Sequence, residues 1–169
     1  FSDAGGDGYD HVNPRGAGNH LGVCAPDSGF GPPFPCNDKL IGAYTYPDTA
    51  AAPDPAGRPS PFDDDGHGSH TASTLGGNLM LSTAVGGIAT GPIVGVAPHA
   101  SLVAYDVCGT PLGGYCPLEA IVAGIDQAAA DGVDVANFSI SGFPGDPWGD
   151  VDSLALLGAL EAGVLTAVA

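Results

Sequence analysis

The second half of the chain alternates short apolar runs with longer mixed segments. Residues 100–107, 132–139 and 163–169 are short runs rich in Val, Ala and Leu, as buried strands are. Residues 118–131 and 152–162 lie between them and have the length of helices. The order strand, helix, strand, helix, strand requires parallel pairing with right-handed crossovers. We therefore predict an α/β fold with a buried parallel sheet and helices on both of its faces.

The first of these helices has the clearest apolar face. Ile121, Ile125 and Ala128 recur at three-to-four spacing, and Gly132 can end the helix in a left-handed conformation. Residues 39–46 form a further β-prone run, which a proline ends. We therefore expect one more strand upstream of the alternating region.

The first third of the chain differs in composition. Gly, Pro, Asp and Asn dominate residues 1–36 and 47–66, so we expect irregular surface loops there. We divide the chain into a loop-rich part, residues 1–62, and an α/β part, residues 63–169. The last predicted strand ends at the final residue, with no helix after it to cover it. We therefore expect an incomplete domain.

Charge limits the classes of partner. Three Lys plus Arg against 19 Asp plus Glu give a net charge of -16, which cannot neutralise phosphates. Nucleic acid and anionic membrane surfaces are therefore not expected partners. No stretch approaches the roughly 18 consecutive apolar residues of a membrane span, and Phe1 does not open a signal sequence. We expect a water-soluble segment.

The four cysteines form two close pairs along the chain. Cys24 lies near Cys36 and Cys108 near Cys116, and each pair brackets a Gly- and Pro-rich loop with little apolar area. Four cysteines allow three connectivities, and we predict the two short-loop disulfides. Four reduced thiols are the alternative, and the absence of a C-x-x-C spacing disfavours a zinc site. Oxidised cysteines would place the protein outside the cytosol.

Reactive side chains are densest in residues 63–73. His67 stands between two glycines, which leave its imidazole accessible and let the backbone approach a substrate. The Thr-Ala-Ser-Thr-Leu run that follows can begin a helix. These residues are compatible with a catalytic base, with a purely structural role, or with a divalent-metal site. The candidate metal ligands are Asp63, Asp65, His67 and His70.

Several segments resemble, in the same order, motifs of the subtilisin-like serine peptidases. Residues 65–73 are similar to the histidine motif D-G-H-G-T-H-x-A-[GS], with Ser69 in place of Thr. The other segments and the motifs that they resemble are residues 95–100 (G-V-A-P-x-A), 126–135 (D-x-A-x-x-D-G-V-D-V), 137–142 (the S-L-G-G substrate-binding strand) and 163–169 (the strand before A-G-N).

The first third resembles one branch of this family. Cys24 and residues 36–43 are similar to the cysteine loop and the C-N-x-K-L-I-G-A run of the cucumisin-like branch, which is common in plants and also found in bacteria. Residues 1–3 resemble the S-F-x-D segment that follows the catalytic aspartate motif. The resemblance implies a parallel-sheet, three-layer subtilisin-like α/β fold, incomplete in this chain, with both parts in one peptidase catalytic domain.

The same resemblance implies a secreted serine endopeptidase with an Asp/His/Ser triad. His67 would be the triad histidine, which takes the serine proton and returns it to the leaving amine. Ser139, Ile140, Ser141 and Gly142 would bind an extended polypeptide substrate, main chain to main chain. No cofactor is implied; structural calcium is compatible with the family, but no specific motif indicates it. The other expected partners are the missing segments of the same catalytic domain.

Two members of the triad are not recognisable in the chain. No D-T-G follows an apolar strand, because Asp48-Thr49-Ala50 comes after the cysteine loop and beside a strand-breaking proline. No G-T-S-M-A occurs, and Ser69 lies inside the histidine motif, where His67 cannot orient it as a nucleophile. Ser141 stands where glycine is usual, which leaves the specificity open.

Three further expectations concern the neighbours of His67. His70 is expected to make a buried hydrogen bond, His99 to lie in a loop, and residues 63–65 to cap the histidine helix. Because the nucleophile, the aspartate and the oxyanion asparagine are not found, we expect the 169-residue chain alone to be inactive. The alternative function is a non-enzymatic pseudoenzyme or an acidic module that binds calcium or proteins.

Overall fold

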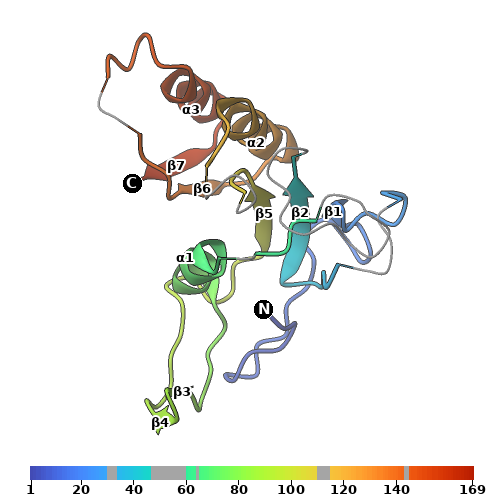
Figure 1. Cartoon of the computed structure of the whole chain (residues 1–169). Helices are drawn as coiled ribbons and strands as arrows, with labels where there is room; N and C mark the ends of the chain where they lie inside the picture. The colour runs from blue at the N-terminus through green and yellow to red at the C-terminus, as the bar shows by residue number, and fades with distance from the viewer. Residues whose placement is uncertain (30–33, 47–59, 64, 110–114, 143–144) are drawn as a thin grey trace.

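The computed structural model describes residues 1–29, 34–46, 60–63, 65–109, 115–142 and 145–169 (Figure 1). The helices of this part are α1 (His67–Gly76), α2 (Leu118–Asp131) and α3 (Val151–Glu161). The strands are β1 (Leu21–Gly22), β2 (Leu40–Thr45), β3 (Ala84–Val85), β4 (Ile88–Ala89), β5 (Leu102–Asp106), β6 (Val135–Phe138) and β7 (Leu165–Val168).

The longer strands pair in parallel, as the alternating pattern predicts. One sheet has the order β1-β2-β5 and another consists of β6 and β7. Helices and parallel strands together confirm the α/β class. The pair β3 and β4 is an antiparallel hairpin that extends away from the rest of the chain (Figure 1).

The sheet arrangement differs from the single buried sheet that the sequence predicts. In the part of the chain that is described, β5 and β6 do not pair, although α2 connects them. Leu165 is 62% exposed, and Val135 and Val168 are exposed as well, so the β6-β7 sheet is not buried. The apolar pattern identifies each strand, but it does not determine which strands are neighbours or what covers them.

Helices α1 and α2 contact opposite faces of β5. A Cβ added at Gly76 of α1 would lie 3.0 Å from Leu102 Cδ2. A Cβ added at Gly124 of α2 would lie 2.7 Å from Val107 Cγ1 and 3.7 Å from Tyr105 Cβ. Because side chains alternate along a strand, Leu102 and Tyr105 point to opposite faces. Helices α1 and α2 therefore contact β5 from opposite sides.

The main apolar cluster lies between α2, α3, β6 and the residue that precedes β7. Its buried members are Ile121, Ile125, Ala159 and Val164, and Val164 is 1% exposed. The predicted apolar face of α2 is therefore confirmed. Gly132 ends that helix with φ at 70°, in the left-handed region that glycine adopts most readily.

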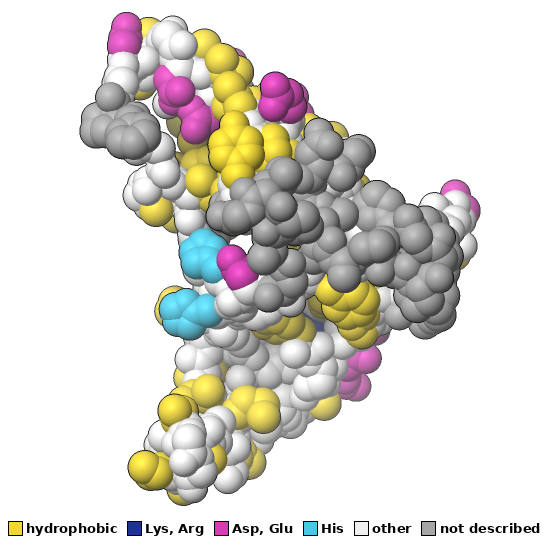
Figure 2. All heavy atoms as spheres, viewed as in Figure 1, with side chains coloured by type: hydrophobic (Ala, Val, Ile, Leu, Met, Phe, Trp, Pro, Cys, Tyr) yellow, Lys and Arg dark blue, Asp and Glu magenta, His cyan; other side chains and the backbone are white. Residues whose placement is uncertain are grey.

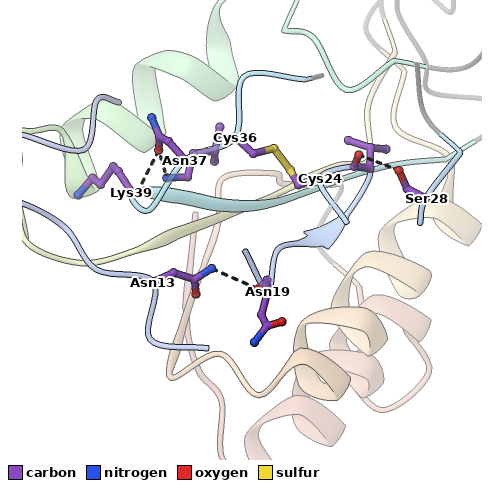
Figure 3. The surroundings of a disulfide bond; sticks show 9 residues. Asn13, Asn19, Cys24, Ser28, Cys36, Asn37 and Lys39 are labelled. Atoms are coloured by element: carbon purple, nitrogen blue, oxygen red, sulfur yellow. Dashed lines mark hydrogen bonds between the residues drawn. A yellow bond between two sulfur atoms is a disulfide. The ribbon is translucent and has the colours of Figure 1, made fainter. Parts of the chain in front are cut away.

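Both predicted disulfides are present. Cys24 is bonded to Cys36, just before β2 (Figure 3). Cys108 is bonded to Cys116, between β5 and α2. All four cysteines are paired, so the reduced and zinc-bound alternatives are wrong. None of the described helices is long and apolar enough to cross a membrane.

Candidate functional site

His67 is the first residue of α1, and it is exposed. Figure 2 shows histidine side chains at the surface in the region where α1 lies in Figure 1. Gly66 precedes the helix with φ at 90°, a conformation that residues with a Cβ rarely adopt. The helix therefore begins at His67, and the predicted start in the following Thr-Ala-Ser-Thr-Leu run is wrong. The glycine turn brings the imidazole to the helix end.

Two carboxylates hold this helix end. Asp63 accepts hydrogen bonds from the backbone N–H groups of Gly66 (2.9 Å) and Ser69 (2.7 Å). Asp65 accepts one from the N–H of His67 at 2.8 Å. The first N–H groups of a helix have no partner inside the helix, so these acceptors replace the missing ones. The predicted capping by this acidic run is confirmed for these two residues, and the Asp between them lies outside the described residues.

The pKa of Asp63 reflects these contacts. Burial raises the pKa of this carboxyl, but the Ser69 hydroxyl and the backbone N–H groups that face it stabilise the charged form more strongly. The pKa is lowered from 3.8 to about 2. Asp63 is therefore ionised at neutral pH and presents a negative charge to the N-terminus of α1, where the helix dipole favours it.

The other end of α1 is held by the segment that resembles G-V-A-P-x-A. The N–H groups of Val96 and Ala97 donate to the carbonyl oxygens of Thr74 (3.0 Å) and Leu75 (2.8 Å). Gly95 approaches the helix end so closely that an added Cβ would overlap the backbone there. This motif therefore closes the carbonyl end of the histidine helix.

The predicted substrate segment follows β6. Ser139 and Ile140 are half-buried, whereas Ser141 and Gly142 are exposed. The strand ends at Phe138, one residue before its predicted end, and Ser139 Oγ accepts a hydrogen bond from the Asn137 side chain at 2.7 Å. Among the described residues, no hydrogen bond joins this segment to α1. The two predicted site elements are therefore not joined by a hydrogen bond in the described part of the chain.

The other histidines near the motif have different surroundings. His70 is exposed and makes no side-chain hydrogen bond within the described part, so the predicted buried bond is wrong. Its position one turn after His67 places it on the same helix face, which nothing described covers. His99 lies in a turn, as predicted, and its Nε2 is 2.8 Å from Asp7 Oδ2.

The described residues do not form a metal cluster. No group of three or more His, Cys, Asp or Glu side chains in this part of the chain could hold an ion. The four candidate ligands of the metal hypothesis, Asp63, Asp65, His67 and His70, therefore do not converge. The segment Asp48-Thr49-Ala50 lies outside the described residues.

A polar network that the sequence analysis missed joins α2 to the first sheet. Asp131 accepts hydrogen bonds from Tyr44 (2.9 Å), Tyr105 (2.8 Å) and Gln127 (2.9 Å). Tyr44 and Tyr105 are opposite each other in register, and their rings stack with centroids 5.2 Å apart. Burial and the neighbouring carboxylate raise the pKa of both phenols. The matched tyrosines on two predicted strands are the sequence signal that could have revealed this network.

Comparison with known proteins identifies the family. The family model described as "Subtilase family" matches residues 18–169. The chain belongs to the subtilase family. Its resemblance to subtilisin-like peptidases, first recognised in the histidine motif, is thus confirmed.

Plant subtilisin-like proteases are among the relatives of the chain. Subtilisin-like protease SBT2.1 of Arabidopsis thaliana is 40% identical over 155 residues, which cover 85% of this chain and 18% of that protein. Subtilisin-like protease SBT5.4 of the same plant is 38% identical over 169 residues, covering 97% of this chain and 20% of that protein. The chain thus spans about a fifth of the length of these curated relatives. Their plant origin agrees with the predicted cucumisin-like branch.

Proposed function

We propose that the complete protein is a secreted serine endopeptidase and that this chain supplies the histidine of its Asp/His/Ser triad. The observation that carries the proposal is the position of His67, exposed at the start of a helix that is held at both ends, in a chain of the subtilase family. The relatives' names as subtilisin-like proteases support the same activity. Two disulfides support an oxidising compartment, as secretion requires.

In this proposal His67 acts as general base and then as general acid. Its imidazole removes the proton of the serine nucleophile as the serine attacks the peptide carbonyl, and then gives that proton to the leaving amine. The aspartate and the serine come from other segments of the complete protein. Asp63 and Asp65 fix the backbone on either side of Gly66, so the ring starts from a defined position. Such pre-positioning contributes to the rate because a small displacement of a catalytic group is costly.

Residues 139–142 bind the substrate in this proposal. Ser141 and Gly142 are exposed just beyond the end of β6, so their main-chain groups are accessible to an extended peptide. Main-chain pairing accepts many sequences, whereas the Ser141 hydroxyl adds a polar group beside the bound peptide. The substrate class is therefore unfolded or flexible polypeptide.

The finer architecture is part of the proposal. We infer that the β1-β2-β5 and β6-β7 sheets belong to one parallel sheet between two helical layers. The support is that all their pairings are parallel, that α2 crosses from β5 to β6, and that α1 and α2 contact opposite faces of β5. Strand β2 lies in residues 1–62 and β5 in residues 63–169, so their pairing supports one catalytic domain. The relatives' length supports further segments of that domain outside this chain.

A serine-directed covalent probe tests the activity. The full-length protein should be labelled and should hydrolyse casein, whereas residues 1–169 should do neither, because acyl transfer needs an activated nucleophile. A full-length protein that is neither labelled nor active would favour the pseudoenzyme or interaction module. Labelling of the 169-residue chain would place the nucleophile within it, and Ser69, Ser139 and Ser141 would then be the residues to substitute.

A further inference from the structure

Lys39 is a fully buried cation that the proposed catalytic mechanism does not use. Its side chain is 0% exposed, and it lies in the turn before β2, where Asn37 Oδ1 accepts a hydrogen bond from its backbone N–H at 3.0 Å. Figure 3 shows that its side chain extends away from the neighbouring Cys24–Cys36 disulfide. A buried ammonium is costly unless it is hydrogen-bonded. Its partners therefore indicate what it holds in place.

Those partners are backbone carbonyl oxygens of one loop. The Lys39 ammonium donates to the oxygen of Pro98 at 2.7 Å and to that of Ala100 at 2.5 Å. No carboxylate pairs with it among the described residues. Burial accordingly lowers the pKa of this ammonium. An ammonium that binds only main-chain oxygens fixes the path of the backbone, here in residues 98–100.

This loop is the same one that closes the histidine helix. Ala97, whose N–H donates to Leu75 at the end of α1, is adjacent to Pro98, whose carbonyl accepts from Lys39. Lys39 also receives a main-chain hydrogen bond, since its carbonyl accepts from the Leu102 N–H at 2.7 Å. The contacts thus run without a break from the Lys39 side chain through the loop to the carbonyl end of α1.

A second side chain from another segment reaches the same oxygen. His11 Nε2 lies 3.1 Å from Pro98 O, and the ring is 4% exposed. Lys39 differs from His11 in spanning two carbonyls of the loop, so it restrains the loop's direction as well as its position. With ten residues, α1 is about 15 Å long, and as a stiff rod it transmits a tilt at one end to His67 at the other.

We propose that Lys39 is a positioning residue for His67, acting through the Pro98–Ala100 loop and the carbonyl end of α1. This inference rests on the proposed peptidase function. Loss of the ammonium would free the loop, let α1 tilt and displace the imidazole from its triad partners. A displacement of about 1 Å can cost about a hundredfold in rate. Substrate binding would be spared, because residues 139–142 follow a different strand, β6.

The test compares Lys39→Met with Ile41→Ala in the full-length protein. Ile41 is buried on β2, two residues after Lys39, and its apolar side chain forms no hydrogen bond with the loop, so its truncation controls for lost stability. Assays are run well below both unfolding temperatures. We expect Lys39→Met to lower kcat by about tenfold to a hundredfold with KM within about twofold, and Ile41→Ala to leave both near wild type.

The pH profile of kcat/KM distinguishes the positioning role from a purely structural role, because a loss of stability alone would leave the profile unchanged. The acid limb of kcat/KM follows protonation of the catalytic histidine. We expect Lys39→Met to shift this limb and Ile41→Ala to leave it in place. If Lys39→Met does not fold, Lys39→Gln, whose amide keeps N–H donors without the charge, should still lower kcat and shift the acid limb relative to wild type, by less than is expected of Lys39→Met.

Two results would overturn the proposal in distinguishable ways. Lys39 variants with the kcat and acid limb of Ile41→Ala, in an active parent, would refute the positioning role alone. A wild-type protein with no peptidase activity would refute the proposed function and the positioning role with it.

Discussion

The Asp63 carboxylate accepts a hydrogen bond from the backbone N–H of Ser69 at 2.7 Å, across six positions of the chain. Its other oxygen accepts from Gly66. One side chain therefore ties the loop before α1 to the first turn of the helix. Asp63, which the sequence analysis expects to cap the helix, therefore connects the preceding loop to the start of α1.

Asp63→Ala should lower the free energy of unfolding by about 1 kcal/mol, because the N–H groups at the helix start lose their acceptor. Urea unfolding at neutral pH measures this change. Asp126→Ala is the matched control, since Asp126 is an exposed helix carboxylate with no hydrogen bond in the described structure. Equal effects of the two substitutions would contradict the capping role.

The same residue predicts a pH dependence. The folded pKa of Asp63 is about 2, below its ordinary value of 3.8, so the unfolded chain binds the proton more readily. Its contribution to stability is complete above pH 3.8 and is lost as the pH falls towards 2. Asp63→Asn should remove this part of the acid dependence in urea titrations between pH 2 and 5. If stability depended on pH in the same way in Asp63→Asn as in wild type, Asp63 would not be the source of this acid dependence.

Tyr105→Phe should destabilise the protein by about 1–3 kcal/mol, because Asp131 loses one of its three donors. Tyr115→Phe is the control, since that side chain is 62% exposed and its hydroxyl makes no hydrogen bond within the described part of the chain. Chemical unfolding of both variants measures the difference. Similar free energies of unfolding for the two variants would show that the Asp131 network contributes little to stability.

The network also predicts behaviour in alkali. The pKa of Tyr46 is raised to about 12, mainly by burial, and those of Tyr44 and Tyr105 are raised as well. The unfolded chain therefore loses these protons first, and stability should fall as the pH rises above about 10. Tyr105→Phe should reduce this loss of stability in unfolding experiments at alkaline pH. The same loss in the variant and in wild type would show that Tyr105 is not one of its sources.

Replacing both Cys108 and Cys116 by Ser should lower stability by about 2–3 kcal/mol, as loop entropy predicts for a sequence separation of 8. Peptide mapping without reductant should find this pair and the Cys24–Cys36 pair. Free thiols or crossed pairs would contradict the structure.

The sequence predicts the elements whose determinants are local. The bounds of α2 agree with the predicted residues because an apolar face and the stop at Gly132 are both encoded within the helix. The two short disulfides follow from spacing for the same reason. The local pattern places the start of α1 too late, because the true start depends on the left-handed turn at Gly66 and on an acceptor six residues away.

Features that depend on distant segments were not predictable. The two-residue strand β1 exists only through its pairing with β2, and no pattern of its own indicates it. The lack of pairing between β5 and β6 depends on the arrangement of strands, which the apolar pattern leaves open. Nothing in the sequence indicates that Lys39 is buried, because a lysine in a turn is normally exposed. Its burial depends on the loop that covers it.

The most direct test of the central claim is the turnover of His67→Ala in the full-length protein, with His70→Ala as control on the same helix face. Loss of the triad histidine lowers kcat about 10⁶-fold in subtilisin, and we expect a loss of that order for His67→Ala. His70→Ala should stay close to wild type, because its side chain makes no hydrogen bond within the described part. A His67→Ala variant that keeps kcat within about tenfold of wild type, or equal modest losses in both variants, would contradict the assignment of His67 as the catalytic base.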